Sequence, residues 1–157
     1  MRIGIGIDIH RFEDSRPLIL GGITVPYSQG LAGHSDADVL THAIMDAILG
    51  ALALGNIGTH FPDTDPQYKN ANSLHLLDQV VALMQDRHYQ LNNLDATILC
   101  QSPKLNPYIS EMRATLANHL QCDCATINIK ATTGESLGFI GRKEGVCVHC
   151  VVLLTQA

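Results

Sequence analysis

The chain has 157 residues, of which 46% are hydrophobic and 16% are charged, a length typical of one domain with a core of its own. The formal net charge of −5 and the 10 scattered lysines and arginines argue against nucleic-acid binding, which usually needs a basic stripe. No apolar run approaches the roughly 20 residues of a membrane-spanning helix, so no membrane partner is expected.

Two further global properties concern assembly and compartment. The charged fraction is below the usual quarter, which favours an oligomer that hides part of the surface. The first residues already have a strand pattern and not that of a signal or transit peptide, so we expect a cytoplasmic protein. Five cysteines, an odd number, argue against a disulfide framework there. Cys147 and Cys150 are three apart in a predicted strand and should face opposite sides, which disfavours a shared ion.

The N-terminal third predicts a strand, a hairpin and a long helix. Period-two alternation predicts a strand over residues 2–10, and a Gly-Gly pair predicts a hairpin over residues 17–25. Helical spacing predicts a helix over residues 35–54, with Ser35 and Asp38 placed as in a capping box.

The remaining elements alternate without a regular βαβ repeat. They are a Gly/Pro/Asp-rich loop over residues 55–72, helices over 73–87 (with Ser73 as N-cap) and 107–120, and strands over 94–100, 126–132 and 145–154. This order predicts an α+β fold in which residues 1–157 form a single domain, with one mixed β-sheet and helices packed on one face.

Asp8 and His10 end the first predicted strand. Because they are two residues apart they should project from the same face, while Ile7 and Ile9 would face the core. A carboxylate beside an imidazole suits zinc, although a hydrogen-bonded surface pair is the plainer alternative.

A second cluster of metal-binding residue types opens the long helix, in the segment GHSDADVLTH over residues 33–42. A helix N-terminus offers free N–H groups that bind phosphate oxygens, and Ser35 could contact a phosphate or simply cap the helix. Three protein ligands with an open position form the pattern of catalytic zinc. Spacing leaves open which residue would join Asp8 and His10, with His34, Asp36, Asp38 and His42 as candidates.

Later segments place small, hydroxyl and glycine residues beside single cations at predicted strand ends. They are HFPDTD at 60–65, QSPKLN at 101–106, KATTGESLG at 130–138 and GRKEG at 141–145. Each is weak alone, but together they indicate a cradle for an anionic ligand.

Five motifs, in order, carry a family resemblance. They are DIH at 8–10, AGHSDADVLTHAIMDAILGALALGNIG at 32–58, HFPDTD at 60–65, QSPKL at 101–105 and KATTGESLGFIGRKEG at 130–145. With these motifs the chain resembles the 2-C-methyl-D-erythritol 2,4-cyclodiphosphate synthase family along its whole length. The resemblance implies a phosphorus–oxygen lyase of non-mevalonate isoprenoid biosynthesis, which converts 4-diphosphocytidyl-2-C-methyl-D-erythritol 2-phosphate into the cyclic 2,4-diphosphate and releases CMP. It also implies a homotrimer with active sites between neighbouring subunits.

The resemblance implies a role for individual residues as well. Zinc would be held by Asp8, His10 and His42, a second ion (magnesium or manganese) by Glu135 and the substrate diphosphate, and the catalytic contacts would come from His34 and Thr133. Phe139 and Arg142 would line a central trimer cavity that can hold isoprenoid diphosphates. The implied substrate contacts are Asp8, Ile9, His10, His34, Ser35, Asn56, Ile57, Gly58, Phe61, Pro62, Asp63, Thr64, Asp65, Cys100, Gln101, Ser102, Pro103, Lys104, Leu105, Asn106, Thr132, Thr133, Gly134, Glu135, Phe139 and Arg142.

The chain departs from the family pattern at two site positions. Asn56 stands where an aspartate is usual, which predicts weakened or altered sugar binding, and Gly134 replaces a bulkier residue beside Glu135. Two other functions are compatible with these residues: a metal-dependent phosphohydrolase with an attacking water, and a non-catalytic trimer that binds isoprenoid diphosphates. The absence of a second close carboxylate cluster disfavours the first, and the retained metal-binding residues disfavour the second.

Overall fold

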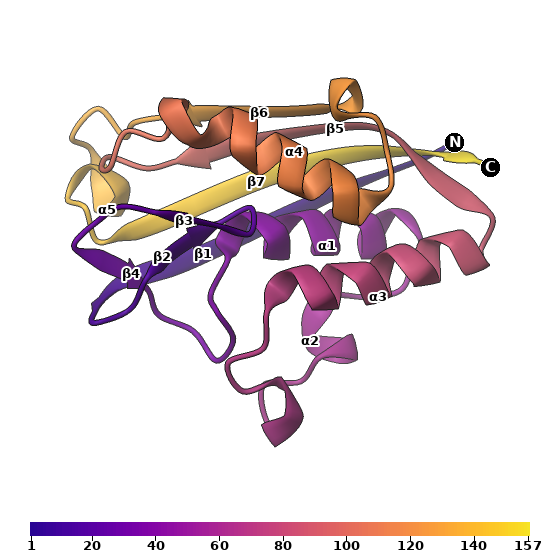
Figure 1. Ribbon diagram of the computed structural model, residues 1–157, viewed down its shortest axis with the longest axis horizontal. Coiled ribbons are helices and arrows are strands. Elements are labelled where there is room, and N and C mark those ends of the chain that lie inside the picture. The colour runs from indigo at the N-terminus through magenta and orange to yellow at the C-terminus, as the bar shows by residue number, and fades with distance from the viewer.

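The computed structural model describes residues 1–157 and contains one five-stranded mixed sheet in the order β4-β1-β7-β5-β6 (Figure 1). Its strands are β1 (Arg2–Asp14), β4 (Gln29–Leu31), β5 (Tyr89–Leu99), β6 (Ile127–Thr132) and β7 (Gly145–Gln156). Only the β5–β6 pair is parallel. The predicted hairpin forms a small ladder of its own, β2 (Leu18–Leu20) and β3 (Ile23–Val25).

Three helices cover one face of the sheet, so the expected α+β arrangement is confirmed (Figure 1). They are α1 (Val39–Ala51), α3 (Ser73–Asp86) and α4 (Ile109–Leu120). Short helical turns connect the elements: α2 (Ile57–His60), α5 (Gly138–Gly141), and the 3₁₀ turns η1 (Pro66–Tyr68), η2 (Asn106–Tyr108) and η3 (Cys124–Thr126). None of the helices combines the length and the apolar character that a transmembrane segment requires.

The two long strands β1 and β7 form the spine of the sheet and bring the two termini side by side (Figure 1). The face under the helices carries Val146, Val148 and Cys150 of β7, all buried, and the opposite face carries Cys147. The two cysteines of the CxxC therefore lie on opposite faces, as their spacing predicts.

The orientation of β1 differs from the prediction. Ile7 and Ile9 were expected in the core, yet they are 50% and 53% exposed, whereas the alternate positions Gly4 and Gly6 lie under α1. The glycines allow the helix backbone to approach the strand, so this face is the core face despite its lack of apolar side chains. Asp8 continues the same row and therefore points toward the helices.

We expect Gly6→Ala to destabilise the fold by about 3 kcal/mol or more, because the added methyl group would overpack the β1–α1 contact. A Cβ at Gly6 would lie 1.9 Å from the carbonyl oxygen of Ala43 and 2.8 Å from the amide nitrogen of Ala47. Chemical denaturation measures the change. Gly50→Ala is the matched control, since its nearest neighbour would be 3.8 Å away, and it should leave stability unchanged or slightly higher. Equal stability of the two variants would contradict the close approach.

The long helix is shorter than predicted at both ends. Its N-cap is Asp38, which accepts a hydrogen bond from the amide of Thr41, and Ser35 lies in the preceding loop, outside any capping box. Ala37 and Ala53 have positive φ angles of 58° and 59°, which bound the helical segment on either side. The predicted helix was too long because apolar residues continue at helical spacing beyond these two positive-φ positions, where the backbone leaves the helical conformation.

The second long helix also begins differently from the prediction. Asn72 is the N-cap of α3, with its side chain accepting from the amide of Leu74, so Ser73 is the first helical residue. The hydroxyl of Ser73 therefore does not cap the helix, and Ser73 is fully buried. Strand β4, helices α2 and α5 and the turns η1 and η3 were not predicted, being too short to show a period.

Candidate active site

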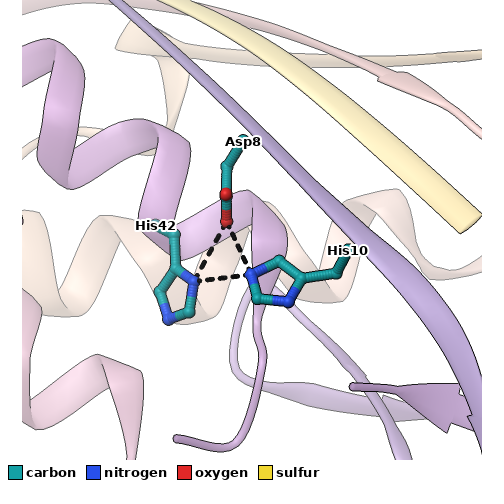
Figure 2. A group of neighbouring side chains, drawn as sticks. All are labelled: Asp8, His10 and His42. Carbon is teal, nitrogen blue, oxygen red and sulfur yellow. Dashed lines mark hydrogen bonds and ion pairs between the residues drawn. The ribbon is translucent and has the colours of Figure 1, made fainter. Parts of the chain in front are cut away.

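Asp8, His10 and His42 meet at the β1–α1 contact. The distances from Asp8 Oδ2 are 2.9 Å to His10 Nε2 and 3.1 Å to His42 Nδ1, and the two ring nitrogens are 3.3 Å apart. Figure 2 shows Asp8 and His10 reaching from the strand and His42 from the helix, with the second nitrogen of each ring turned away from the cluster.

The charges in this cluster favour an ionised carboxylate. Burial alone would raise the pKa of Asp8, but hydrogen bonds from His10 and His42 outweigh it and hold that pKa well below its usual range. Burial lowers the pKa of His10, and the hydrogen bond and charge of Asp8 raise it by more, so its pKa is raised overall. Asp8 is therefore available as an anionic ligand at neutral pH.

The donor set fits a divalent metal ion. Tetrahedral zinc with bonds of about 2.0–2.1 Å would hold its ligand atoms about 3.3–3.4 Å apart, close to the spacing of these three atoms. Nδ1 of His10 lies within hydrogen-bonding distance of the carbonyl oxygen of Ala32, which can only accept, so Nδ1 carries a proton and Nε2 is the ring nitrogen that faces the cluster. The three residues thus form a group able to bind a divalent metal ion.

A pocket of about 360 Å³ opens above these ligands. Its walls come from the loop before α1, from α1 itself, from the α2–η1 segment and from α3. The lining residues are Asp8, His10, His34, Ser35, His42, Met45, Ile57, Gly58, Phe61, Asp63, Tyr68 and Leu76. The rings of Phe61 and Tyr68 meet edge to face with centroids 5.5 Å apart, which braces the loop side of the pocket.

Two polar anchors hold the walls of this metal pocket in place. Arg16 donates hydrogen bonds to the carbonyl oxygens of Gly33 (2.7 Å) and Ser35 (2.6 Å), which fixes the loop that carries His34. Asp46, one turn after His42, accepts a 2.7 Å hydrogen bond from the amide of Ile57. No short-range pattern singles out Arg16, because its partners are backbone carbonyls distant along the chain.

The structure also shows what the other candidate ligands do. Asp38 is fully buried and accepts four hydrogen bonds, from the amides of Gly21, Gly22 and Thr41 and from the Thr41 hydroxyl. Burial raises the pKa of Asp38, and these bonds oppose the shift. Its role is to tie the hairpin to α1. Asp36 accepts hydrogen bonds from Ser73, so neither aspartate reaches the metal group.

A second pocket, of about 510 Å³, lies where the parallel strands β5 and β6 end. Its lining residues are Cys100, Gln101, Pro103, Lys104, Leu105, Asn106, Pro107, Ala131, Thr132 and Thr133. Gln101 joins the two strand-end loops by accepting from the amides of Gly134 (3.2 Å) and Ser136 (3.4 Å). Burial raises the pKa of the Cys100 thiol to about 11, so this cysteine is protonated at neutral pH.

The first pocket, called the metal pocket, and the second, called the strand-end pocket, share no lining residue. The predicted site residues therefore fall into two separate groups within one chain. Thr133 donates a 2.6 Å hydrogen bond to the carboxylate of Glu135, beside the second pocket. The pocket walls also contain residues that sequence reasoning did not nominate, namely Met45, Tyr68, Leu76, Pro107 and Ala131. Several nominated residues line neither pocket: Ile9, Asn56, Pro62, Thr64, Asp65, Ser102, Gly134, Glu135, Phe139 and Arg142.

Three of these outlying residues have other partners in the structure. The side-chain oxygen of Asn56 caps α2 by accepting from the amide (3.1 Å) and hydroxyl (3.2 Å) of Thr59, so this oxygen is already engaged. Gly134 packs so tightly that an added Cβ would lie 2.8 Å from the amide nitrogen of Gly141. Arg142 forms a two-pronged ion pair with Glu144 on the surface.

The YgbB family matches residues 1–155 of this sequence. The chain belongs to the YgbB family. Among curated YgbB-type relatives, the 2-C-methyl-D-erythritol 2,4-cyclodiphosphate synthase of Geobacter metallireducens is 61% identical over 156 residues, which cover 99% of both chains. The synthase of Clostridioides difficile is 55% identical and covers 99% of this chain and 98% of its own. The family resemblance predicted from the five motifs is confirmed.

Solved structures agree with this membership in the YgbB family. The bifunctional IspDF from Campylobacter jejuni superimposes with a TM-score of 0.96 at 46% identity, covering 99% of this chain, which spans 42% of that longer chain. A 2C-methyl-D-erythritol-2,4-cyclodiphosphate synthase described as a CDP-bound form superimposes with a TM-score of 0.90 at 35% identity, covering 98% of this chain and 100% of that one.

Proposed function

We propose that this chain converts 4-diphosphocytidyl-2-C-methyl-D-erythritol 2-phosphate into 2-C-methyl-D-erythritol 2,4-cyclodiphosphate and releases CMP, as a lyase of non-mevalonate isoprenoid biosynthesis in the cytoplasm. The observation that carries the proposal is the three-ligand group on the wall of the metal pocket, in a chain that matches synthases over 99% of its length. Residues 1–157 act as one domain.

The metal in this proposal is zinc at Asp8, His10 and His42, and a second ion, magnesium or manganese, is held by Glu135 and the substrate diphosphate. One carboxylate and two imidazoles suit zinc, and an oxygen-only site at Glu135 suits the harder ion. When bound, these ions neutralise phosphate charge and orient the reacting groups.

The proposed active enzyme is a homotrimer in which the metal pocket of one subunit faces the strand-end pocket of its neighbour. Ile3, Ile5, Ile7 and Ile9 of β1 are 71%, 61%, 50% and 53% exposed on the sheet face that carries no helix, together with Val151 of β7. A row of apolar side chains of this size on a bare sheet face is typical of a protein interface. Around the trimer axis, Phe139 and Arg142 line a central cavity that can hold an isoprenoid diphosphate.

In the proposed reaction an oxygen of the 2-phosphate attacks the β-phosphorus, and the bond to the CMP oxygen breaks. No protein nucleophile is needed, so the side chains bind, orient and stabilise charge. His34 and Ser35 hold phosphate at the loop before α1, and the segment from Phe61 to Asp65 borders the methylerythritol part. In the neighbour's pocket Lys104 and the residues around it hold the cytidine diphosphate. The Thr133 hydroxyl, which donates to Glu135 in the free chain, turns to donate to the transferring phosphoryl group.

We expect purified protein with the cytidine substrate to give two products by phosphorus NMR, the cyclic diphosphate and CMP. Removal of the metal with a chelator should abolish turnover, and zinc added together with magnesium should restore it, because tethering and charge neutralisation both depend on the bound ions. Release of orthophosphate would instead indicate a hydrolase. An enzyme that retains full turnover after verified removal of zinc would contradict the proposal.

A further inference from the structure

His42 has a second ring nitrogen that faces away from the metal group, toward the buried hydroxyl of Ser73. His42 Nε2 is 2.9 Å from the hydroxyl oxygen of Ser73, the first residue of α3. Ser73 is fully buried, and its hydroxyl donates to the carboxylate of Asp36. The amides of Ser73 (2.8 Å) and Asp38 (3.1 Å) also donate to that carboxylate.

Counting hydrogens along this chain fixes the position of the imidazole proton. A serine hydroxyl has one hydrogen, and the carboxylate of Asp36 has none to give. Because the hydroxyl of Ser73 donates to Asp36, its oxygen can only accept from Nε2 of His42. Nε2 of His42 therefore carries a proton, and Nδ1, 3.1 Å from Asp8 Oδ2, is the ring nitrogen that faces the metal group.

The nearby hydroxyl of Ser35 does not determine which nitrogen of His42 carries the proton. Its oxygen lies 3.2 Å from His42 Nε2 and accepts from the amide of Ala37 at 3.2 Å, so its hydrogen is free to rotate. Capping does not account for Ser73 either, since Asn72 caps α3. The buried hydroxyl and the carboxylate behind it therefore serve the histidine.

We propose that Asp36 and Ser73 are positioning residues that hold His42 in its Nε2–H tautomer, with Nδ1 presented to the metal. This inference rests on the metal site of the proposed function. Hydrogen-bonded partners behind a metal-binding histidine fix its ring and tautomer, and their loss typically costs about 10–100-fold in metal affinity. His10, held through Nδ1 by the Ala32 carbonyl, presents the other type of ring nitrogen. The two imidazoles are thus oriented by separate partners.

The test compares Ser73→Ala and Asp36→Asn with Ser110→Ala, an exposed serine in the first turn of α4. Long-range proton–nitrogen NMR on the metal-free proteins, at alkaline pH where free imidazole is neutral, reports the tautomer of His42. Competition with a chromophoric chelator gives the dissociation constant for zinc alone. Asp36→Asn keeps the side-chain size and guards against a folding defect in the serine variant.

We expect His42 of the unaltered protein to carry its proton on Nε2. Ser73→Ala and Asp36→Asn should each give a mixture of tautomers and bind zinc about 10–100-fold more weakly, while Ser110→Ala changes neither property. A proton on Nδ1 in the unaltered protein, or an unchanged tautomer and zinc affinity in both variants, would overturn the proposal. If the unaltered protein binds no zinc, the metal site of the proposed function fails, and the NMR measurement still decides the tautomer.

Discussion

His42→Ala is expected to lose bound zinc and to lower kcat by more than about 10³-fold. Removal of one preorganised hydrogen-bond donor already costs about 10²–10³-fold in other enzymes, and here the change would also remove the ion that His42 holds. His42 is 7% exposed and sits in the helix that packs on Gly6, so this packing holds its side chain at the metal group. Zinc content by elemental analysis and turnover by phosphorus NMR measure the two losses.

His75→Ala is the matched control for His42→Ala. His75 lies on the exposed side of α3, outside both pockets, so its removal should leave zinc content and rate unchanged. Thermal unfolding of both variants separates loss of the ion from loss of the fold. A His42→Ala protein with full zinc and a normal rate would remove His42 from the metal site.

The second large effect is expected from mixing two inactive variants. Thr133→Ala should lower kcat by about 10²–10³-fold through the strand-end pocket, and His42→Ala acts through the metal pocket. In a ring of three randomly mixed subunits, roughly a quarter of the sites would pair an intact metal pocket with an intact neighbouring strand-end pocket. Co-expression of the two variants should therefore recover roughly a quarter of the unaltered rate.

This recovery depends on the separation of the two pockets, which share no lining residue in one chain. Co-expression of Thr133→Ala with itself gives the background, and analytical ultracentrifugation gives the number of subunits. If the mixed protein is trimeric and yet no more active than the two variants measured apart, the site lies within a single chain. A monomeric active protein would exclude the shared site directly.

The local elements were predictable because their signals are short-range. Alternation along residues 2–10 and the glycine pair in the hairpin located β1, β2 and β3, although β1 continues to Asp14. The motifs were also sufficient for the family, since five of them in a fixed order leave little room for another assignment. The ends of the long helix were harder to predict. Positive φ angles at Ala37 and Ala53 end the helical conformation, but the sequence at these alanines shows no stop signal strong enough to outweigh the apolar spacing.

The direction in which β1 faces shows the limit of such signals. The alternation of residue types predicts that Asp8 and His10 share one face of the strand and that Ile7 and Ile9 face the core. In the structure Gly4 and Gly6 take the core positions, because α1 packs its backbone directly on the strand. The isoleucines lie on the sheet face without helices, where they are exposed in a single chain and would be buried by the proposed subunit contact.

The sequence by itself determined the residue types, the spacing of Asp8 with His10 and the family of the chain. Spacing left the third ligand open and the family resemblance named His42; the tertiary structure brings His42 to Asp8 and His10. Only the tertiary structure decided that Asp36 and Asp38 serve Ser73 and the hairpin instead. The physical reason is that ligand geometry depends on where α1 crosses β1, and that crossing is set by contacts between segments more than 30 residues apart. The proton of His42 likewise depends on partners that only the folded chain brings together.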